Sequence, residues 1–260
     1  MNKARAIFLS FLFFFAFYPV SSARADTEIL YKTSYICRDL SGKPRWRAEY
    51  EIRREGDKSY SIIEKGRGYY SGFEGNISWV EEAGIEAVGD TIRPLWMKKR
   101  IFDENGKAIA VREQMFDFDN NTVTCTHDDL IKNTSSGKKF KFKGNIINRL
   151  MQGLYVQRFI ENGKTSERVE FISPEPALYT LDLRLLGAEE IKIDGRRIKA
   201  YKLLLDPVLG VFNFVKVFLP EARVWHSARP KFEWLKYEGV ESSVKSPRVV
   251  ITTLDEALFK

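Results

Sequence analysis

From about residue 27 onward, apolar and polar side chains alternate with a period of two along most of the chain. The segment 45–53 is typical, because Trp46, Ala48, Tyr50 and Ile52 alternate with charged residues. This alternation predicts a strand with one buried face and one face in water. The same pattern predicts strands at about 60–64, 69–74, 76–81, 84–89, 98–103, 107–118 and 122–127.

Short turn sequences separate these segments, among them Glu74-Gly75-Asn76, Ala83-Gly84 and Asn120-Asn121. Closely spaced strands joined by such turns are typical of antiparallel sandwiches and barrels. Asp194-Gly195 is a strong signal for a tight hairpin. Further strands are expected at about 166–173, 177–184, 188–193, 196–206, 211–219, 222–227, 231–238 and 247–253.

One segment has a different period. Between residues 145 and 161 the apolar residues recur at steps of three and four, and Asn162-Gly163 supplies a stop signal. We expect an amphipathic helix over about 145–161. The fold class predicted is mainly β, with residues 26–260 forming a single antiparallel β-barrel or deeply curved half-barrel that has this helix inside it or capping it.

The first 25 residues have the three parts of a secretory signal peptide. Lys3 and Arg5 precede an apolar run over residues 7–20, and Ala23-Arg24-Ala25 provides a cleavage site before Asp26. An uncleaved anchor would need about 20 apolar residues, and Pro19 ends the run too early. We therefore expect residues 1–25 to be removed, and the protein to be periplasmic or secreted from a bacterium and not membrane-spanning after cleavage.

The formal net charge of the full chain is +7. The leader contributes Lys3, Arg5 and Arg24 and no acidic residue, so the expected mature chain carries only +4. A nucleic-acid-binding protein would show a concentrated basic stripe, and none is present. Nucleic acid is therefore not expected as a partner.

Cys37 and Cys125 are the two cysteines of the chain. Both follow an alternating pattern, so both could point inward from neighbouring strands, and an exported protein meets an oxidising environment. The sequence favours a disulfide between them. Two separate buried thiols are the alternative.

The search for catalytic or metal-binding motifs is mostly negative. His127 stands beside two aspartates but has no second histidine nearby, and Asp117, Asp119 and Asn121 lack the glycine that a calcium loop needs. Neighbouring carboxylates such as Glu81 and Glu82 point to opposite faces of a strand. We therefore expect no catalytic residues, no metal and no cofactor.

Lys139, Lys141 and Lys143 alternate with Phe140 and Phe142, so one face of this segment is cationic and the other aromatic. The three lysines could simply keep a sheet edge from pairing with another chain. They could also form a rim that attracts the anionic headgroups of lipids. Both interpretations stay open at this point.

Aromatic residues make up 13% of the chain, and those on predicted strands share the apolar face. Such side chains could fill the core of a small barrel. They could also line a cavity for an acyl chain or another apolar ligand. The candidate ligand-binding residues are Trp46, Tyr50, Phe116, Phe118, Leu150, Leu154, Phe214 and Trp234.

The hairpin sequence over residues 114–123, Gln-Met-Phe-Asp-Phe-Asp-Asn-Asn-Thr-Val, resembles a hairpin of the exported bacterial family DUF3108, a domain of unknown function. A later helix with Leu150, Leu154 and Arg158, then Val224-Trp225 and Arg229-Pro230, follow in a similar order. The resemblance covers roughly residues 28–240. It implies a curved β-barrel like those of periplasmic lipoprotein carriers, and it carries over no catalytic residue.

We expect a non-enzymatic envelope protein that binds an apolar or amphipathic, lipid-like ligand in a cavity of several hundred Å³ lined by aromatic residues. The alternative is an envelope assembly or protein-interaction scaffold that binds a protein partner and no small ligand. A hydrolase of envelope polymers would need two carboxylates, or a histidine and an acid, converging in a cleft. Nothing in the sequence places such a pair.

Overall fold

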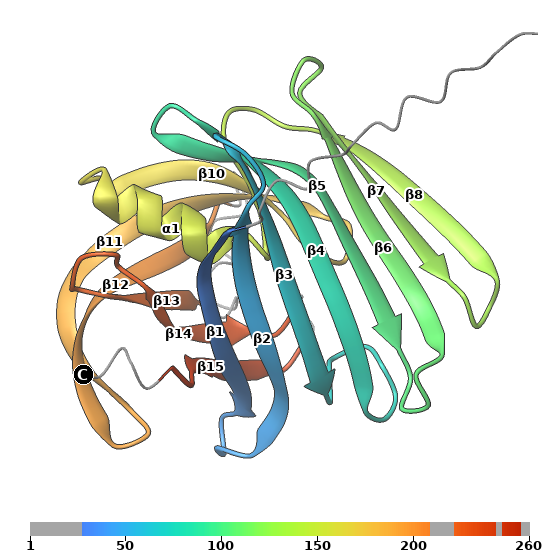
Figure 1. Ribbon diagram of the computed structural model, residues 1–260, viewed down its shortest axis with the longest axis horizontal. Helices are drawn as coiled ribbons and strands as arrows, with labels where there is room; N and C mark the ends of the chain where they lie inside the picture. The colour runs from blue at the N-terminus through green and yellow to red at the C-terminus, as the bar shows by residue number, and fades with distance from the viewer. Residues whose placement is uncertain (1–27, 209–220, 243–245, 256–260) are drawn as a thin grey trace, which may run out of the picture.

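The computed structural model describes residues 28–208, 221–242 and 246–255, and it contains fifteen strands and one helix (Figure 1). The first eight strands form a meander: β1 (Glu28–Asp39), β2 (Pro44–Arg54), β3 (Ser59–Gly68), β4 (Ile77–Val88), β5 (Thr91–Phe102), β6 (Ala108–Asp117), β7 (Thr122–Asp129) and β8 (Thr134–Lys141). The remaining elements are β9 (Ile146–Asn148), α1 (Gln152–Glu161), β10 (Ser166–Ile172), β11 (Leu178–Ile193), β12 (Arg196–Pro207), β13 (Ala222–Ser227), β14 (Trp234–Val240) and β15 (Arg248–Thr253).

All fifteen strands belong to one sheet, in the order β8-β7-β6-β5-β4-β3-β2-β1-β15-β14-β13-β12-β11-β10-β9. Neighbouring strands are antiparallel, except that β9 pairs parallel with β10. The first and last strands lie side by side, with Tyr35 opposite Thr253. The sheet therefore consists of two hairpin series that are joined at the middle by β1 and β15.

The sheet is not closed, so the closed form of the predicted barrel is wrong. It ends at β8 on one side and at β9 on the other. The two edge regions nevertheless meet through side chains in a buried rim cluster of Val123, Cys125, Phe142, Ile146 and Ile172. Because β9 has only three residues before the chain turns into α1, it offers little backbone with which to complete a ladder of hydrogen bonds.

The predicted helix over 145–161 is partly wrong, because α1 begins at Gln152. Residues 146–148 form β9 instead, where Ile147 pairs with Phe171. All three residues of β9 are buried, and a short run with both faces buried cannot be assigned to strand or helix from its period. The Asn148 side chain accepts a hydrogen bond from the Met151 backbone N–H at 3.1 Å and turns the chain into α1.

Several predicted strand boundaries also change. Residues 69–74 form the turn between β3 and β4, whereas Ala83-Gly84 lies inside β4 and makes no turn. A Cβ atom at Gly84 would lie 2.4 Å from Trp96 Nε1, so this glycine provides space for an indole ring on the neighbouring strand. The expected breaks at residue 83 and after residue 184 both disappear into the long strands β4 and β11.

The helix packs inside the curved sheet and contacts both walls. Tyr155, Val156, Phe159 and Ile160 are buried in a helix-side cluster that also contains apolar residues of β3–β5 and β11–β13. A second hydrophobic cluster, called here the lower cluster, is built around Trp46, Tyr70 and Trp79. Its other buried residues come from β1, β2, β4–β6 and β15. No helix in the described ranges is long and apolar enough to cross a membrane. The predicted leader 1–25 and the predicted strand 211–219 lie outside the described residues.

Candidate ligand-binding cavity

A row of polar side chains crosses the inner face of the meander. One buried residue of each of five neighbouring strands stands directly opposite the next, in the order Tyr50, Glu64, Glu81, Lys99 and Arg112. The strand period places these residues on the same face as the apolar core, because Glu64 follows Ile62 by two positions and Lys99 follows Met97 by two. The inner face of the sheet therefore carries a row of polar and charged side chains that crosses five strands.

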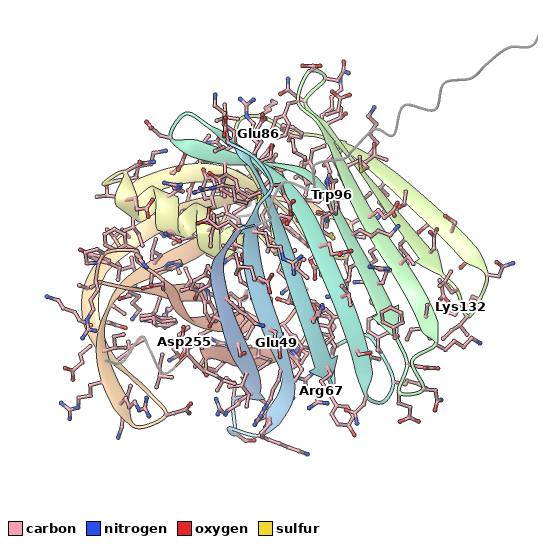
Figure 2. All side chains as sticks on the ribbon, viewed as in Figure 1. Glu49, Arg67, Glu86, Trp96, Lys132 and Asp255 are labelled. Carbon is pink, nitrogen blue, oxygen red and sulfur yellow. The ribbon has the colours of Figure 1, made fainter. Side chains whose placement is uncertain are left out.

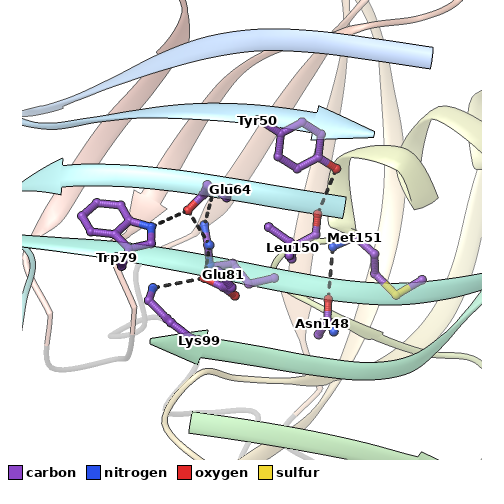
Figure 3. A network of polar contacts seen from close by, with 9 residues as sticks. Tyr50, Glu64, Trp79, Glu81, Lys99, Asn148, Leu150 and Met151 are labelled. Atoms are coloured by element: carbon purple, nitrogen blue, oxygen red, sulfur yellow. Dashed lines mark hydrogen bonds and ion pairs between the residues drawn. The ribbon is translucent and has the colours of Figure 1, made fainter. Parts of the chain in front are cut away.

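The carboxylates of Glu64 and Glu81 are opposite each other on β3 and β4, a pairing of like charges that destabilises a sheet on its own. Arg149 resolves this conflict from the turn before α1. Its guanidinium donates to both oxygens of Glu64, at 2.7 and 3.1 Å, and also to Glu81. Figure 3 shows this network beside the start of α1.

Lys99 completes the network on the other side of Glu81. Its Nζ lies 3.1 Å from Glu81 Oε2, and both side chains are 1% exposed. The ammonium also lies 4.5 Å from the ring centre of Tyr70 and 5.1 Å from that of Trp79, distances at which aromatic faces attract cations. Glu64, Glu81, Arg149 and Lys99, called here the ion network, therefore carry two negative and two positive charges.

The ion network holds the Glu81 carboxylate in the ionised form. Burial alone would raise the pKa of Glu81, but the charges of Arg149 and Lys99 outweigh burial and lower that pKa to about 2. The pKa of Arg149 is raised despite its burial, because Glu64 and Glu81 lie beside it. Glu81 consequently has no proton to donate near neutral pH.

Trp79 links the ion network to the lower cluster. Its Nε1 donates to Glu64 Oε1 at 2.8 Å. The indole lies directly over Gly66 of the neighbouring strand, where an added Cβ would meet the ring at 2.1 Å. Because Gly66 has no side chain, the Trp79 indole can lie where its Nε1 donates to the buried Glu64 carboxylate.

A third buried carboxylate, Glu241, holds three parts of the chain together. Arg45 forms two hydrogen bonds of 3.0 Å with it, Trp46 Nε1 donates at 2.8 Å, and the Ser71 backbone N–H donates at 2.7 Å. The Glu241 side chain is fully buried. It holds the turn between β3 and β4, which carries Tyr70, against β2.

A cavity of about 190 Å³ lies between the helix-side cluster and the lower cluster. Its walls are mostly aromatic and aliphatic, and its polar lining includes Glu64, Arg149 and Glu241. Tyr50, which also lines it, donates its hydroxyl to the Leu150 carbonyl at 3.1 Å. The other lining residues are Tyr31, Tyr35, Trp46, Ile52, Tyr70, Leu150, Gln152, Gly153, Leu154, Gln157, Phe171, Pro174, Glu233, Trp234, Tyr237, Val240, Ser242 and Ile251.

Five of the eight candidate ligand-binding residues line this cavity: Trp46, Tyr50, Leu150, Leu154 and Trp234. Phe116 and Phe118 do not, because β9 and β10 cover the inner face of β6 and β7 and both rings pack against the rim cluster. Phe118 lies 5.3 Å from Phe142, ring centre to ring centre. Phe214 lies outside the described residues. That the five residues contact a ligand stays a prediction.

The lysine segment lies at the free edge of the sheet and not at the cavity. Lys139 and Lys141 belong to β8, Lys143 follows it, and all three are exposed. Phe140 and Phe142 turn inward to the rim cluster. The arrangement fits edge protection, and none of the three lysines lines the cavity. Their binding of anionic headgroups stays a prediction.

The predicted disulfide is wrong, because Cys37 and Cys125 are both free and buried. Cys37 belongs to β1 and Cys125 to β7, and five strands lie between them. At about 4.8 Å per strand, this separation along the sheet is roughly 29 Å, whereas a disulfide needs Cα atoms within about 7 Å. Both segments alternate as expected, but alternation does not show which strands are neighbours.

Two histidines differ in their surroundings. His226 is completely buried, and its Nδ1 lies 2.7 Å from the Phe232 carbonyl oxygen, so we assign the proton to Nδ1. Burial lowers the pKa of His226 to about 4. His127 is half-buried on β7, and within the described ranges no three His, Cys, Asp or Glu side chains converge as a metal site.

Five charged residues around the cavity were not predicted from the sequence as part of a site: Glu64, Glu81, Lys99, Arg149 and Glu241. A signal for three of them was available, because Glu64, Glu81 and Lys99 each occupy an inward position of an alternating strand. A charged residue at such a position indicates a buried ion pair. Arg149 and Glu241 lie outside regular strands, so the period of the sequence carries no information about them.

No family model, no curated protein and no solved structure matches this chain. The resemblance to the DUF3108 family therefore stays a prediction.

Proposed function

We propose that this chain is an exported, non-enzymatic binding protein that holds an apolar or amphipathic, lipid-like ligand between its curved sheet and α1. The cavity of about 190 Å³ carries the proposal. Small-molecule sites are concave and mostly apolar, with a few polar groups that orient the ligand. The aromatic and aliphatic walls of this cavity, with Glu64, Arg149 and Glu241 among them, have this make-up.

The volume limits the ligand. It is smaller than the several hundred Å³ expected from the sequence, and it is close to that of an engineered apolar cavity of about 150 Å³ that binds benzene. The cavity as it stands holds one ring or a short section of an acyl chain. The remainder of a longer ligand would extend past Gln152 and Gln157 of α1, which line the same cavity.

The chemistry of the polar lining supports binding in preference to acid–base catalysis. A hydrolase with two carboxylates needs one of them protonated, to act as the general acid. Glu64 and Glu81 do face each other, but Arg149 contacts both, and Lys99 also pairs with Glu81. This environment lowers the pKa of Glu81 and keeps it ionised.

An assembly role is the second candidate, and the free edge at β8 favours it. The turn from β7 to β8 exposes Leu130 by 46% and Ile131 by 70%, beside Lys132 (Figure 2). A strand edge with an apolar tip can pair with a segment of another protein. The lysines of β8 oppose this use, because they are typical of protected edges.

Native mass spectrometry of the protein purified from the envelope of a bacterium that exports it, followed by lipid extraction, tests the first proposal. We expect a copurified apolar or amphipathic species. Leu154→Trp and Gly153→Leu should each fill the cavity and remove that species, whereas Leu130→Trp on the exposed turn should retain it.

Gly153→Leu is a second cavity-filling variant, which keeps the test valid if Leu154→Trp does not fold. Its Cβ would lie 3.5 Å from Trp234, an ordinary contact, and leucine favours a helix more than glycine does. Absence of any bound species from the well-folded protein, at good signal, would refute the binding proposal. A copurified protein in its place would support the assembly role.

A further inference from the structure

The polar residues of the cavity identify the chemical class of the ligand. We propose that the ligand carries an uncharged hydroxyl or carbonyl group and that this group binds at Tyr70. The inference rests on the proposed binding function and adds the nature of the polar head and its contact residue.

Charged ligand heads are disfavoured at the ion network and at Glu241, because the charges there already compensate one another; Glu233 also lines the cavity and adds one negative charge. The ion network is neutral as a whole, and Glu241 is paired with Arg45. A ligand carboxylate would approach Glu64, Glu241 and Glu233 without gaining an unpaired cation. A ligand ammonium would meet Arg149, whose side chain is 21% exposed, while the Glu64 side chain is only 4% exposed. Burial of a charge without a partner is costly.

Tyr70 offers the unused hydrogen-bonding group. The residue is only 4% exposed, and its hydroxyl has no hydrogen-bond partner among the described residues. Its ring is held in place by Trp79 at 5.2 Å and Trp46 at 6.3 Å, and by the Lys99 ammonium over its face. Buried hydroxyls are nearly always paired, so this one requires a partner that the chain does not supply.

Other cavity tyrosines contrast with Tyr70. Tyr50 donates to the Leu150 carbonyl at 3.1 Å and Tyr237 donates to the Val240 carbonyl at 2.9 Å. Burial, and next the nearby Tyr70, raise the pKa of Tyr237, which places Tyr70 close to another cavity-lining residue. Tyr31, which also lines the cavity, shares the lack of a partner among the described residues, but Tyr70 is the one of the two that packs beside the Lys99 ammonium. The structure thus separates hydroxyls that serve the fold from those of Tyr70 and Tyr31, and we assign the ligand contact to Tyr70.

Arg149 adds a second donor of the same kind. Three of its hydrogen bonds go to Glu64 and Glu81, but its Nε–H has no partner among the described residues. A carbonyl or hydroxyl oxygen accepts hydrogen bonds from such donors without bringing a charge into the cavity. The apolar part of the same ligand would pack against Leu154 and Trp234, which line the cavity from the helix-side cluster.

Four small probes separate the possibilities by isothermal titration calorimetry. Benzyl alcohol carries the proposed hydroxyl, and ethylbenzene has the same shape without it. Benzylammonium and benzoate carry a positive and a negative charge. We expect benzyl alcohol to bind at least about tenfold more tightly than either charged probe.

The decisive comparison uses Tyr70→Phe, which removes only the unpaired hydroxyl. We expect this variant to weaken benzyl alcohol binding about fivefold, the size of one net hydrogen bond, and to leave ethylbenzene binding unchanged. Tyr155→Phe is the matched control, because its hydroxyl is also buried without a hydrogen-bond partner among the described residues but does not line the cavity. It should leave the binding of both probes unchanged.

The outcomes separate the inference from the binding function. If no probe binds, both the binding function and the inference are wrong. If ethylbenzene and benzyl alcohol bind but Tyr70→Phe affects them equally, the cavity is a binding site without a polar subsite at Tyr70, and only the inference fails. Tighter binding of benzoate or benzylammonium than of benzyl alcohol would also overturn it.

Discussion

The ion network and Tyr70 both contribute to the cavity lining, but they differ in how far the chain itself pairs their polar groups. In the ion network, Arg149 and Lys99 compensate the charges of Glu64 and Glu81 within the chain. The Arg149 guanidinium lies 2.7 and 3.1 Å from the Glu64 oxygens, and Lys99 Nζ lies 3.1 Å from Glu81 Oε2. At Tyr70, a buried neutral hydroxyl has no partner in the described chain. The charges of the ion network therefore compensate one another within the chain, whereas the neutral Tyr70 hydroxyl has no partner there, and this difference leads us to an uncharged ligand.

The largest expected effect comes from removing Arg149, the cation of the ion network that contacts both carboxylates. Arg149→Met would leave Glu64 and Glu81 buried and facing each other, and loss of one partner from a buried ion pair costs about 3–5 kcal/mol. We expect urea denaturation at pH 7 to show a fall of this size in the free energy of unfolding.

Two further variants sharpen that result. Arg149→Met combined with Glu64→Gln leaves the neutral Glu81 and Lys99 pair and should recover at least half of the loss. Arg100→Met breaks a pair with Glu82 on the outer face, where the side chains are 46% and 33% exposed, and should cost at most about 1 kcal/mol. Equal costs for Arg149→Met and Arg100→Met would contradict the role of Arg149.

Lowering the pH affects the buried neutral His226 and the buried ionised Glu81 over different pH ranges. The pKa of His226 is about 4 in the fold and 6.5 without it, so the unfolded chain binds more protons between these values. Stability should therefore fall by about 3 kcal/mol as the pH is lowered from 6.5 to 4. Because the pKa of Glu81 is also lowered, its contribution is present above 4.5 and is lost as the pH falls toward 2.

Unfolding free energies measured across this pH range check the assignment. His226→Asn keeps a donor toward the Phe232 carbonyl and cannot titrate, so its stability should stay nearly constant from pH 6.5 to 4. A slope as steep as that of the wild type would assign the acid sensitivity to other groups.

A steric change tests how Trp79 supports the ion network. Gly66→Ala would place a Cβ atom 2.1 Å from the Trp79 ring and displace the indole from Glu64. We expect a loss of about 1–3 kcal/mol, as for other overpacked cores, measured by thermal unfolding. Gly137→Ala on the edge strand β8, where the new Cβ would lie 3.6 Å from the nearest atom, should change stability by less than about 0.5 kcal/mol.

The smallest effect concerns the unpaired hydroxyl itself. Without ligand, Tyr70→Phe should leave stability unchanged or raise it by up to about 1 kcal/mol, because it removes an unsatisfied buried group. Tyr50→Phe should lower stability by about 1 kcal/mol, because the Leu150 carbonyl loses its donor. Differential scanning fluorimetry of both variants gives the signs, and a loss of stability in Tyr70→Phe would show that its hydroxyl is already paired.

Local sequence patterns predicted the local structure well. The alternation at Trp46, Ala48, Tyr50 and Ile52 gave the inward face of β2, because burial on one side of a sheet imposes a period of two. The mainly β class followed from such alternating segments, and the one helix of the described residues followed from the segment whose apolar residues recur at steps of three and four. The helix start was wrong because the apolar run at 146–148 is buried in a parallel pair with β10, which the period of three or four does not reveal.

Long-range placement could not be predicted in the same way. Cys37 and Cys125 both point inward, yet five strands separate them, because a period of two gives the face of a residue and not the order of the strands. The same limit applies to Arg149, which reaches Glu64 and Glu81 from the turn between β9 and α1, outside the meander. Phe116 and Phe118 face inward as expected, but β9 and β10 cover them.

A crystal structure of the protein with 4-bromobenzyl alcohol tests the central claim most directly, because the anomalous signal of bromine locates one end of the probe. We predict the alcohol oxygen at hydrogen-bonding distance from Tyr70 Oη, about 2.7–2.8 Å, and the bromine on the side of Leu154 and Trp234. A probe bound with its oxygen away from Tyr70, or bound only outside the cavity, would contradict the account.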